Sequence, residues 1–579
     1  MLRKPQKDLF TRLMTLLMLA LVVLPILTAC GDPSDSNDRT EQTTPAESGT
    51  LSEGAPALIP DPEKAKAPDN PEKTLYAASQ ELYNDAPRGC QTITVLAEYT
   101  KGLDYDVFAK KDTNTKQYRL YLPCRVDPAS VTYTVTHKDG KVSGPYTVDL
   151  SDTTVTDNER VVGNNNSYQI IAMQSNLPTV MVQIDEAYGT IKEMNADKTH
   201  NTFAYGDMVT TVTDKLALEK GWSTRYESKD TNPKKECSLD MRGRGNTTWV
   251  LAKKPYQIRS ENEIDLLGMG LGTTYALMAN YRDATGARTQ IALDLGEAIG
   301  LEYTVAQRQV DFFLNGTYMG MYVITEKIEV APNRVEIDQK TEFLFEVDQY
   351  YNQNGNVGIG FPQFDEQCRF RIHNDDDPAH VEKGKQILTN AFTALYSGNE
   401  QEFLKYFDLD SWARMYLFQM YSMNSDAYHG SLFFYYSAKD QKLHACSPWD
   451  FDWSFGGSHR EDPKWWDPYV CDRSQNGISK PMIGYNAFLT KVCDLYYKEK
   501  VRDVLATVPA MVKVYEAENR LSFAMNETAA AVFYYPSGKA TNYTEACAHL
   551  YTTCVERLNW MDSKVQSHAA KAGYLIPLT

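Results

Sequence analysis

The chain has 579 residues, with 59 lysine and arginine residues against 76 aspartate and glutamate residues and a formal net charge of −17. Hydrophobic residues make up 42% of the chain and aromatic residues 11%, enough to bury real cores, so a wholly disordered or fibrous protein is excluded. The acidic balance also argues against a nucleic-acid binder, because neutralising phosphates requires a basic face.

The first 30 residues have the pattern of an export signal. The basic start consists of Arg3, Lys4, Lys7 and Arg12. Residues 13–27 are apolar and uncharged. This stretch is shorter than a typical transmembrane helix and has the length of a signal-peptide core. The following Thr28-Ala29-Cys30 resembles the lipobox of bacterial lipoproteins, which implies cleavage after residue 29 and lipid attachment to Cys30. We therefore expect an extracytoplasmic, membrane-anchored lipoprotein; an ordinary secretory signal is the alternative.

Residues 30–75 are expected to form a tether behind the lipidated Cys30. Residues 31–73 contain ten acidic residues, four basic residues and seven prolines. Such a stretch buries too little apolar surface to offset its ordering entropy, so we expect disorder. The tether would hold the folded part away from the membrane.

Residues 88–177 are expected to form a small antiparallel, Ig-like β-sandwich. Six runs from here to residue 184 alternate apolar and polar residues between Gly, Asn and Asp turns: 92–99, 118–126, 131–137, 146–150, 168–174 and 179–184. Cys90 and Cys124 flank part of this region and are a candidate disulfide pair. Nine cysteines remain after Cys30, so at least one has no partner within the chain.

Residues 178–570 mix strands with longer helical patterns, which indicates a large α+β domain. Residues 380–397 have a helical period, and Asp410 is a candidate cap for the helix that follows it. Three further helical segments are expected at 485–508, 510–533 and 543–565.

Two motifs contain residues suited to phosphate and metal chemistry. In the run 241–249, Gly243 and Gly245 alternate with Arg242 and Arg244, and Lys254 follows. Glycines allow close approach of a backbone to a ligand, and the cationic side chains suit phosphate oxygens. Taken alone, structural turn glycines with surface arginines are the alternative.

The second motif is formed by two acidic segments. Asp426 lies on a loop after an apolar helix, where it can orient a hydroxyl or act as a base. Asp450 and Asp452 lie among aromatic residues, where unpaired carboxylates are costly and a divalent ion such as Mg²⁺ is a natural partner. If this segment is a strand, the two carboxylates share one face. A helix-end cap and a solvated turn are the alternatives.

Together these motifs resemble the CotH family, the spore-coat protein H type of atypical kinase. The similar runs, in order, are RGRGNTTW with KKPYQIR, LMANYRDATGARTQIALDL, QVDFFLNGTYMGMYVITEKIE, FLFEVDQYY, LDSWARMYLFQMYSMNSDAY and LHACSPWDFDWSFG. The resemblance covers about residues 178–565. It implies a bilobal kinase-like fold that binds ATP with Mg²⁺ or Mn²⁺ and phosphorylates Ser or Thr of a protein.

The resemblance also implies roles for individual residues. Asp426 corresponds to the catalytic aspartate, and Asp450 to the metal-binding aspartate, with Asp452 as a second ligand. Lys254 is the candidate phosphate-contacting lysine, and Glu326 is its candidate partner. The sequence departs from the kinase pattern five residues after Asp426, where Ser431 replaces an asparagine that helps hold a second metal; Asn424 is the candidate substitute.

Two other functions remain open. The first is a surface-binding, adhesion or coat-organising protein with weak or no catalysis, because Ser431 is a poorer ligand and an exported protein meets little ATP. The second is a carbohydrate-binding surface protein, with Trp465 and Trp466 as sugar-stacking residues and the paired carboxylates as candidates for glycoside hydrolysis.

Overall fold

The computed structural model of the protein describes residues 78–80, 90–112, 117–151, 160–162, 166–229, 236–348, 369–374, 377–424, 430–457, 477–529 and 540–577. All of them belong to one of two units of the chain, Asp61–Thr579. Among these residues, no helix is long and apolar enough to cross a membrane. The expected signal, Cys30 and the whole expected tether lie outside the described residues.

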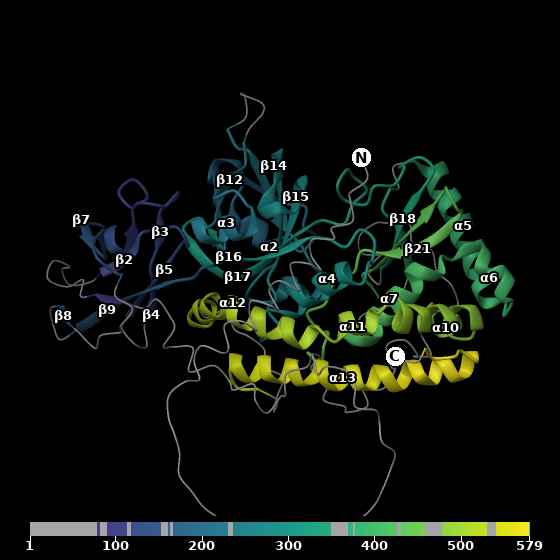
Figure 1. Cartoon of the computed structure of the whole chain (residues 1–579). Coiled ribbons are helices and arrows are strands. Elements are labelled where there is room, and N and C mark those ends of the chain that lie inside the picture. The colour runs from purple at the N-terminus through teal and green to yellow at the C-terminus, as the bar shows by residue number, and fades with distance from the viewer. Residues whose placement is uncertain are drawn as a thin grey trace, which may run out of the picture. The chain divides into compact units, whose positions relative to one another are not determined.

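Two small sheets form the N-terminal region (Figure 1). One has the order β1-β9-β5-β4 with β8 on β9, and the other has the order β3-β2-β6-β7. Their strands are β1 (Ala78–Gln80), β2 (Cys90–Val95), β3 (Val107–Phe108), β4 (Lys110–Asp112), β5 (Gln117–Leu122), β6 (Val131–His137), β7 (Val142–Val148), β8 (Arg160–Val162) and β9 (Asn166–Gln174). The expectation of an all-antiparallel sandwich is wrong for one pair, because β5 and β9 run parallel.

The core between these two sheets continues into the rest of the protein. Ile93 and Val135 from one sheet and Leu120 from the other lie in one buried cluster, which also contains Phe313 and Met525 from much later in the chain. The sandwich is therefore packed against the larger part, rather than carried as a separate spacer.

Cys124 does not form the expected disulfide. It is a buried free cysteine, and its thiol donates a hydrogen bond to the carbonyl of Thr211 at 3.4 Å. Burial raises the pKa of this thiol. The side chain therefore serves packing between the sandwich and the next sheet.

The next sheet has eight strands in the order β10-β16-β17-β15-β14-β13-β11-β12, and β10 also pairs with β11. This second pairing closes seven of the strands into a ring. The strands are β10 (Thr179–Ile184), β11 (Phe203–Thr211), β12 (Arg225–Glu227), β13 (Leu239–Gly243), β14 (Tyr256–Asp265), β15 (Leu271–Met278), β16 (Gln307–Leu314) and β17 (Thr317–Glu326). Alternate residues such as Val182, Ile258 and Phe312 fill one buried cluster, as the two-residue period of strands requires.

Three helices accompany the ring sheet: α2 (Ile191–Ala196), α3 (Asp214–Lys220) and α4 (Arg288–Ala298). On the outer side of β16, buried Asp311 accepts hydrogen bonds from Ser175, Tyr318 and Ser522. Ser175 follows the sandwich and Ser522 belongs to a C-terminal helix, so one carboxylate links three parts of the chain.

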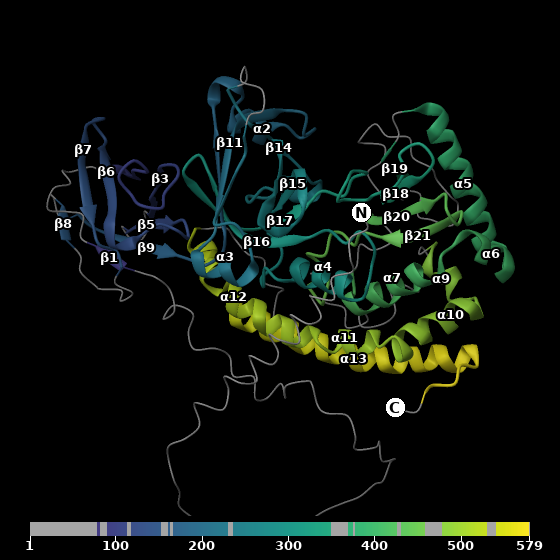
Figure 2. The same ribbon diagram turned by 45° about the horizontal axis from the view of Figure 1, so that its top comes forward.

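The C-terminal half contains a four-stranded sheet covered by helices (Figure 2). Its order is β19-β18-β20-β21, with β18 (Phe343–Asp348), β19 (Arg369–Ile372), β20 (Leu432–Ser437) and β21 (Lys442–Cys446). The helices are α5 (Pro378–Tyr396), α6 (Glu400–Tyr406), α7 (Leu409–Ser422), α9 (Ser479–Met482), α10 (Asn486–Cys493), α11 (Val501–Leu505), α12 (Val508–Thr528) and α13 (Tyr543–Ala572). Helices α12 and α13 run side by side.

The mixed α+β class is confirmed, and helices lie at the expected segments 380–397, 485–508, 510–533 and 543–565 as far as these are described. The segment 485–508 is interrupted at Lys500, which has a φ of +59°, so that α10 and α11 are separate.

A further correction concerns a helix start. Asp408, not Asp410, caps α7: its carboxylate accepts the backbone N–H of Ser411 at 2.8 Å. Asp410 lies in the first turn, where it forms ion pairs with Arg414 and Lys491. Both aspartates suit the start of a helix, one as its cap and the other in its first turn. The backbone conformation before the helix decides which of them is the cap.

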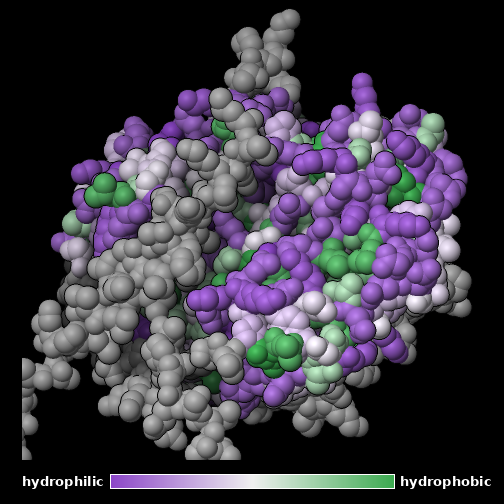
Figure 3. Space-filling view, turned by 45° about the vertical axis from the view of Figure 1, so that its right-hand side comes forward, coloured by the Kyte–Doolittle hydropathy of each residue, from purple (hydrophilic) through white to green (hydrophobic). Residues whose placement is uncertain are grey.

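The surface is mainly hydrophilic on the face shown in Figure 3, where hydrophobic residues form small separate patches. This pattern is typical of a folded domain in water. No patch on that face is extensive enough to indicate a partner by itself.

A buried histidine makes stability depend on pH. The hydroxyl of Tyr416 in α7 lies 2.8 Å from Nε2 of His568 in α13, and burial lowers the pKa of His568 to about 4. The unfolded chain binds this proton near pH 6.5, so we expect stability to fall by about 3 kcal/mol as the pH drops from 6.5 to 4. Urea unfolding of the wild type and His568→Gln at several pH values measures this. Equal pH dependence of the two proteins would contradict the assignment.

Candidate functional site

The glycine-rich loop lies between β13 and β14 and is shaped by Trp249. A Cβ on Gly243 would lie 2.3 Å from the indole ring of Trp249, which is 3% exposed. Gly245 has a φ of +84°, a conformation that favours glycine. The packing of Trp249 and the turn itself therefore account for both glycines without a ligand.

Two of the predicted cationic residues contact parts of the same loop and ring sheet. Lys254 donates to the carbonyl of Trp249 at 2.5 Å and lies 4.6 Å from the centre of its ring, and burial lowers the pKa of this lysine. Arg242 lies over the ring of Phe203 at 5.5 Å and donates to the side-chain oxygen of Gln257 at 3.3 Å. Both cations remain half-buried at the surface of the ring sheet.

Arg244 connects the glycine-rich loop to the segment that contains Asp450. Its guanidinium lies 5.2 Å from the ring centre of Trp449. Burial lowers the pKa of Arg244, while the negative charges of Asp450 and Glu346 act in the opposite direction. The fold thus brings two of the predicted site residues, distant in sequence, into one electrostatic environment.

The segment after β21 is a turn and not the strand considered from the sequence. β21 ends at Cys446, and Asp450 has a φ of +68°, in the left-handed region. Residues 452–457 continue as turns, with Asp450 exposed and Asp452 half-buried. The argument that both carboxylates share one strand face is therefore wrong, and the spacing argument for glycoside hydrolysis loses its basis.

Asn424 positions the Asp450 turn. Its side-chain amide is 2% exposed and donates to the backbone carbonyl of Asp450 at 3.1 Å. The backbone N–H of Phe455 donates to the carbonyl of Ser422, the last residue of α7, at 2.6 Å. The end of α7 is therefore joined to the turn at two points.

Some predicted residues fall outside the described part of the chain. These include Asp426, Trp465 and Trp466. Ser431, at the position that departs from the kinase pattern, lies directly before β20 with a φ of +59°. The roles of these residues remain predictions.

The run LMANYRDATGART, in which the motifs predicted no site residue, supports the same turn. Asp283 and Arg288 form an ion pair with side chains 0% and 2% exposed. A Cβ on Gly457 would lie 2.6 Å from Nε of Arg288, so only glycine fits there. Arg282 lies 4.8 Å from the ring centre of Trp453. The sequence signal for this ion pair was an aspartate followed five residues later by an arginine at the start of a helix.

Lys253, the neighbour of the predicted Lys254, is the more buried lysine. It is 5% exposed and lies 4.4 Å from the ring centre of Tyr322, and its ammonium donates to the carbonyls of Ala279 and Met321. Burial lowers the pKa of Lys253 to about 7. Adjacent residues in an extended segment point in opposite directions, which places one lysine inside and the other outside.

Glu326 forms a buried ion pair with Arg334. Both side chains are 2% exposed, and the second carboxylate oxygen of Glu326 accepts the backbone N–H of Ala306 at 2.8 Å. Lys254 contacts a different part of β17: its backbone carbonyl accepts a hydrogen bond from the hydroxyl of Tyr322 at 2.9 Å. The partner that the structure assigns to Glu326 is therefore Arg334, eight residues later in the chain.

A comparison with models of known families confirms the resemblance that the motifs indicated. The sequence profile of the CotH kinase protein family matches residues 241–561, so the chain belongs to this family. Among solved structures, the chain is similar to the Helicobacter pylori proinflammatory kinase CtkA, at 11% sequence identity. The similarity covers 51% of this chain and 91% of that chain, with a TM-score of 0.24. No curated protein matches the chain.

Glu326→Gln tests the buried pair. The substitution leaves the Arg334 charge buried without its counter-charge, so we expect a loss of roughly 3 to 5 kcal/mol in the free energy of unfolding. The matched control is Glu329→Gln, which removes a partly exposed pair with Lys327 and should cost less than about 1 kcal/mol. Chemical denaturation measures both, and equal losses would contradict the structural role of Glu326.

Proposed function

We propose that the protein is a kinase that uses ATP with Mg²⁺ or Mn²⁺ to phosphorylate Ser or Thr residues of another protein. Membership of the CotH kinase family supports this class. The observation that carries the proposal is the contact of Arg244 with Trp449, the residue before Asp450, at 5.2 Å from guanidinium to ring centre. It unites a cation on a glycine-containing loop with an exposed carboxylate, the two groups that a metal–phosphate complex needs.

The donor chemistry of these residues fits the cofactors. Carboxylate oxygens are the ligands that Mg²⁺ prefers, and Asp450 with Asp452 would hold the ion, with Asn424 as a further candidate. Arg244, with Arg242 and Lys254 nearby on the loop of Gly243 and Gly245, would contact phosphate oxygens. A planar guanidinium suits this task because it donates two parallel hydrogen bonds.

In this proposal the residues mainly position groups and stabilise charge. Asp426 orients the substrate hydroxyl and accepts its proton, and the bound metal would supply charge neutralisation at the phosphates. Arg244 stabilises negative charge on the transferred group, and Asn424 holds the turn that presents the Asp450 carboxylate. The ring sheet and the helical half then correspond to the two lobes of a kinase-like fold.

We also propose that the protein acts outside the cytoplasm, attached to a membrane through lipid on Cys30. The signal-like residues 1–29 and the acidic, proline-rich segment that follows support this location. The substrate would then be a surface or coat protein that the tether allows the domain to reach.

A surface-binding or coat-organising protein without catalysis is the second candidate, and Ser431 is the observation that favours it. A hydroxyl is a poorer metal ligand than the amide oxygen found at that position in kinases. A thermal-shift measurement with ATP and Mg²⁺ or Mn²⁺ separates the candidates, because a ligand that binds the folded state raises the melting temperature. No shift with either metal favours the binding protein.

Asp450→Ala tests the metal site. We expect the substitution to weaken metal-dependent ATP binding by more than about tenfold, because it removes a charged oxygen ligand. Titration calorimetry with ATP in the presence of Mg²⁺ measures the affinity. Asp139→Ala, in an exposed turn of the sandwich, is the control and should bind like the wild type. Unchanged affinity in Asp450→Ala would refute the assignment.

Asp426→Ala tests the catalytic role. The variant should retain ATP binding but lose phosphate transfer by about 10²-fold or more, because a positioned base contributes that much. Transfer is followed with γ-labelled ATP and a serine-rich acceptor protein. Full labelling by the variant would rule out this role, while loss of both binding and transfer would indicate a role in nucleotide binding instead.

A further inference from the structure

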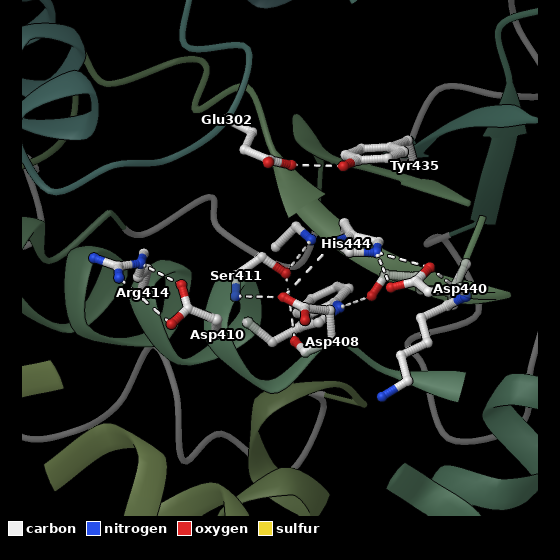
Figure 4. Close-up of polar contacts among 12 residues, drawn as sticks. Glu302, Asp408, Asp410, Ser411, Arg414, Tyr435, Asp440 and His444 are labelled. Atoms are coloured by element: carbon white, nitrogen blue, oxygen red, sulfur yellow. Dashed lines mark hydrogen bonds and ion pairs between the residues drawn. The ribbon is translucent and has the colours of Figure 1, made fainter. Parts of the chain in front are cut away.

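A second group of potential metal ligands lies away from the proposed site. Asp408 caps α7, Asp440 lies in the turn between β20 and β21, and His444 lies within β21. One ligand atom from each lies within 4.8 Å of the others. Figure 4 shows His444 flanked by the two carboxylates.

The imidazole of His444 is held in place by its surroundings. The ring of Tyr435 stacks on it with centroids 4.9 Å apart and planes 14° apart. The hydroxyl of Tyr435 in turn donates to Glu302 at 2.5 Å. The histidine side chain is 15% exposed, so the ring is oriented before any ligand binds.

Each ring nitrogen of His444 faces a carboxylate. Nε2 lies 3.0 and 3.2 Å from the two carboxylate oxygens of Asp440, within hydrogen-bond distance. Nδ1 lies 3.7 Å from Oδ1 of Asp408, too far for a hydrogen bond. This separation leaves room for a cation between Nδ1 and the carboxylate oxygen of Asp408.

The distance between Nδ1 and the Asp408 oxygen suits two ligands of one metal ion. Zinc binds histidine nitrogen and carboxylate oxygen at about 2.0 to 2.2 Å, which puts two ligands at a tetrahedral angle about 3.4 Å apart. The same Asp408 oxygen accepts the N–H of Ser411, which fixes its position. A small movement of the His444 and Asp408 side chains therefore brings both ligand atoms to the distance that one zinc ion requires.

The local charge also favours a cation. Among the described residues, neither Asp408 nor Asp440 forms an ion pair with a lysine or arginine; the basic side chain near both is the imidazole of His444. Asp410, two residues further on, pairs with both Arg414 and Lys491. The carboxylates of Asp408 and Asp440 thus lie near one histidine, while the lysine and arginine side chains pair with Asp410.

We propose that His444 Nδ1 and the Asp408 carboxylate bind a zinc-type divalent metal ion, with Asp440 holding the ring through Nε2 and water completing the coordination. A carboxylate that orients a ligating histidine is a common feature of metal sites. The ion joins the start of α7 to β21. These two elements lead into the segments that contain Asp426 and Asp450, so the metal stiffens the support of the proposed kinase site from a distance.

The experiment is titration of the chelator-treated full-length Asp450→Ala protein with ZnCl₂ in excess Mg²⁺. This background removes a ligand of the proposed catalytic metal, so the result does not depend on kinase activity. We expect one equivalent of Zn²⁺ to bind. Adding His444→Gln should lower the affinity more than about tenfold, since loss of an orienting group alone costs that much. Adding His380→Gln, whose imidazole contacts Asn374 and Phe343, should change nothing.

A second variant covers the risk that His444→Gln disturbs folding. Asp408→Asn keeps a good helix cap but weakens the metal ligand, so its melting temperature in chelator should match the parent while its Zn²⁺ affinity falls. Equal Zn²⁺ binding in all variants, or no binding by the parent, would overturn the proposal. If the parent binds no metal and the imidazole of His444 titrates as a cation by NMR, a proton occupies the position instead.

Discussion

The described structure around the proposed site depends on how the end of α7 is joined to the turn after β21. The carbonyl of Ser422 accepts the N–H of Phe455 at 2.6 Å, and the Asn424 amide donates to the carbonyl of Asp450 at 3.1 Å. Helix ends leave carbonyls without partners, and here the turn supplies one donor. Without this junction, the Asp450 carboxylate would have no fixed position relative to the segment after α7.

Buried charges hold the two sides of this junction. Arg557 of α13 is 2% exposed and donates to the carbonyl of Met420 near the end of α7, where a positive charge also suits the helix dipole. On the other side, the Asp283–Arg288 pair packs against Gly457. Each of these charged side chains is costly to bury alone. Their hydrogen bonds and ion pairs form only when the helices, the loop and the turn are assembled together. The same logic applies to Asp311, which links the sandwich, the ring sheet and α12.

Much of the fold could be predicted from residue patterns. Alternation identified strands such as β5 and β9, and the helical period identified α5, α12 and α13, because both patterns are set by local geometry. Their partners could not be predicted. The parallel pairing of β5 with β9, the ring closure through β10 and the continuation of the sandwich core into Phe313 all depend on contacts between distant segments.

The sequence by itself determined the class of protein: the ordered motifs identify the CotH kinase family, and the spacing of apolar residues gives a mixed α+β domain. The tertiary structure alone decided how individual charges are used. In the structure, Lys253 rather than Lys254 is buried, and Glu326 forms its ion pair with Arg334. Asp408 rather than Asp410 caps α7, and Asp450 lies in a turn rather than in a strand. The physical reason is that the cost of a buried charge depends on its neighbours in space, which no local pattern encodes.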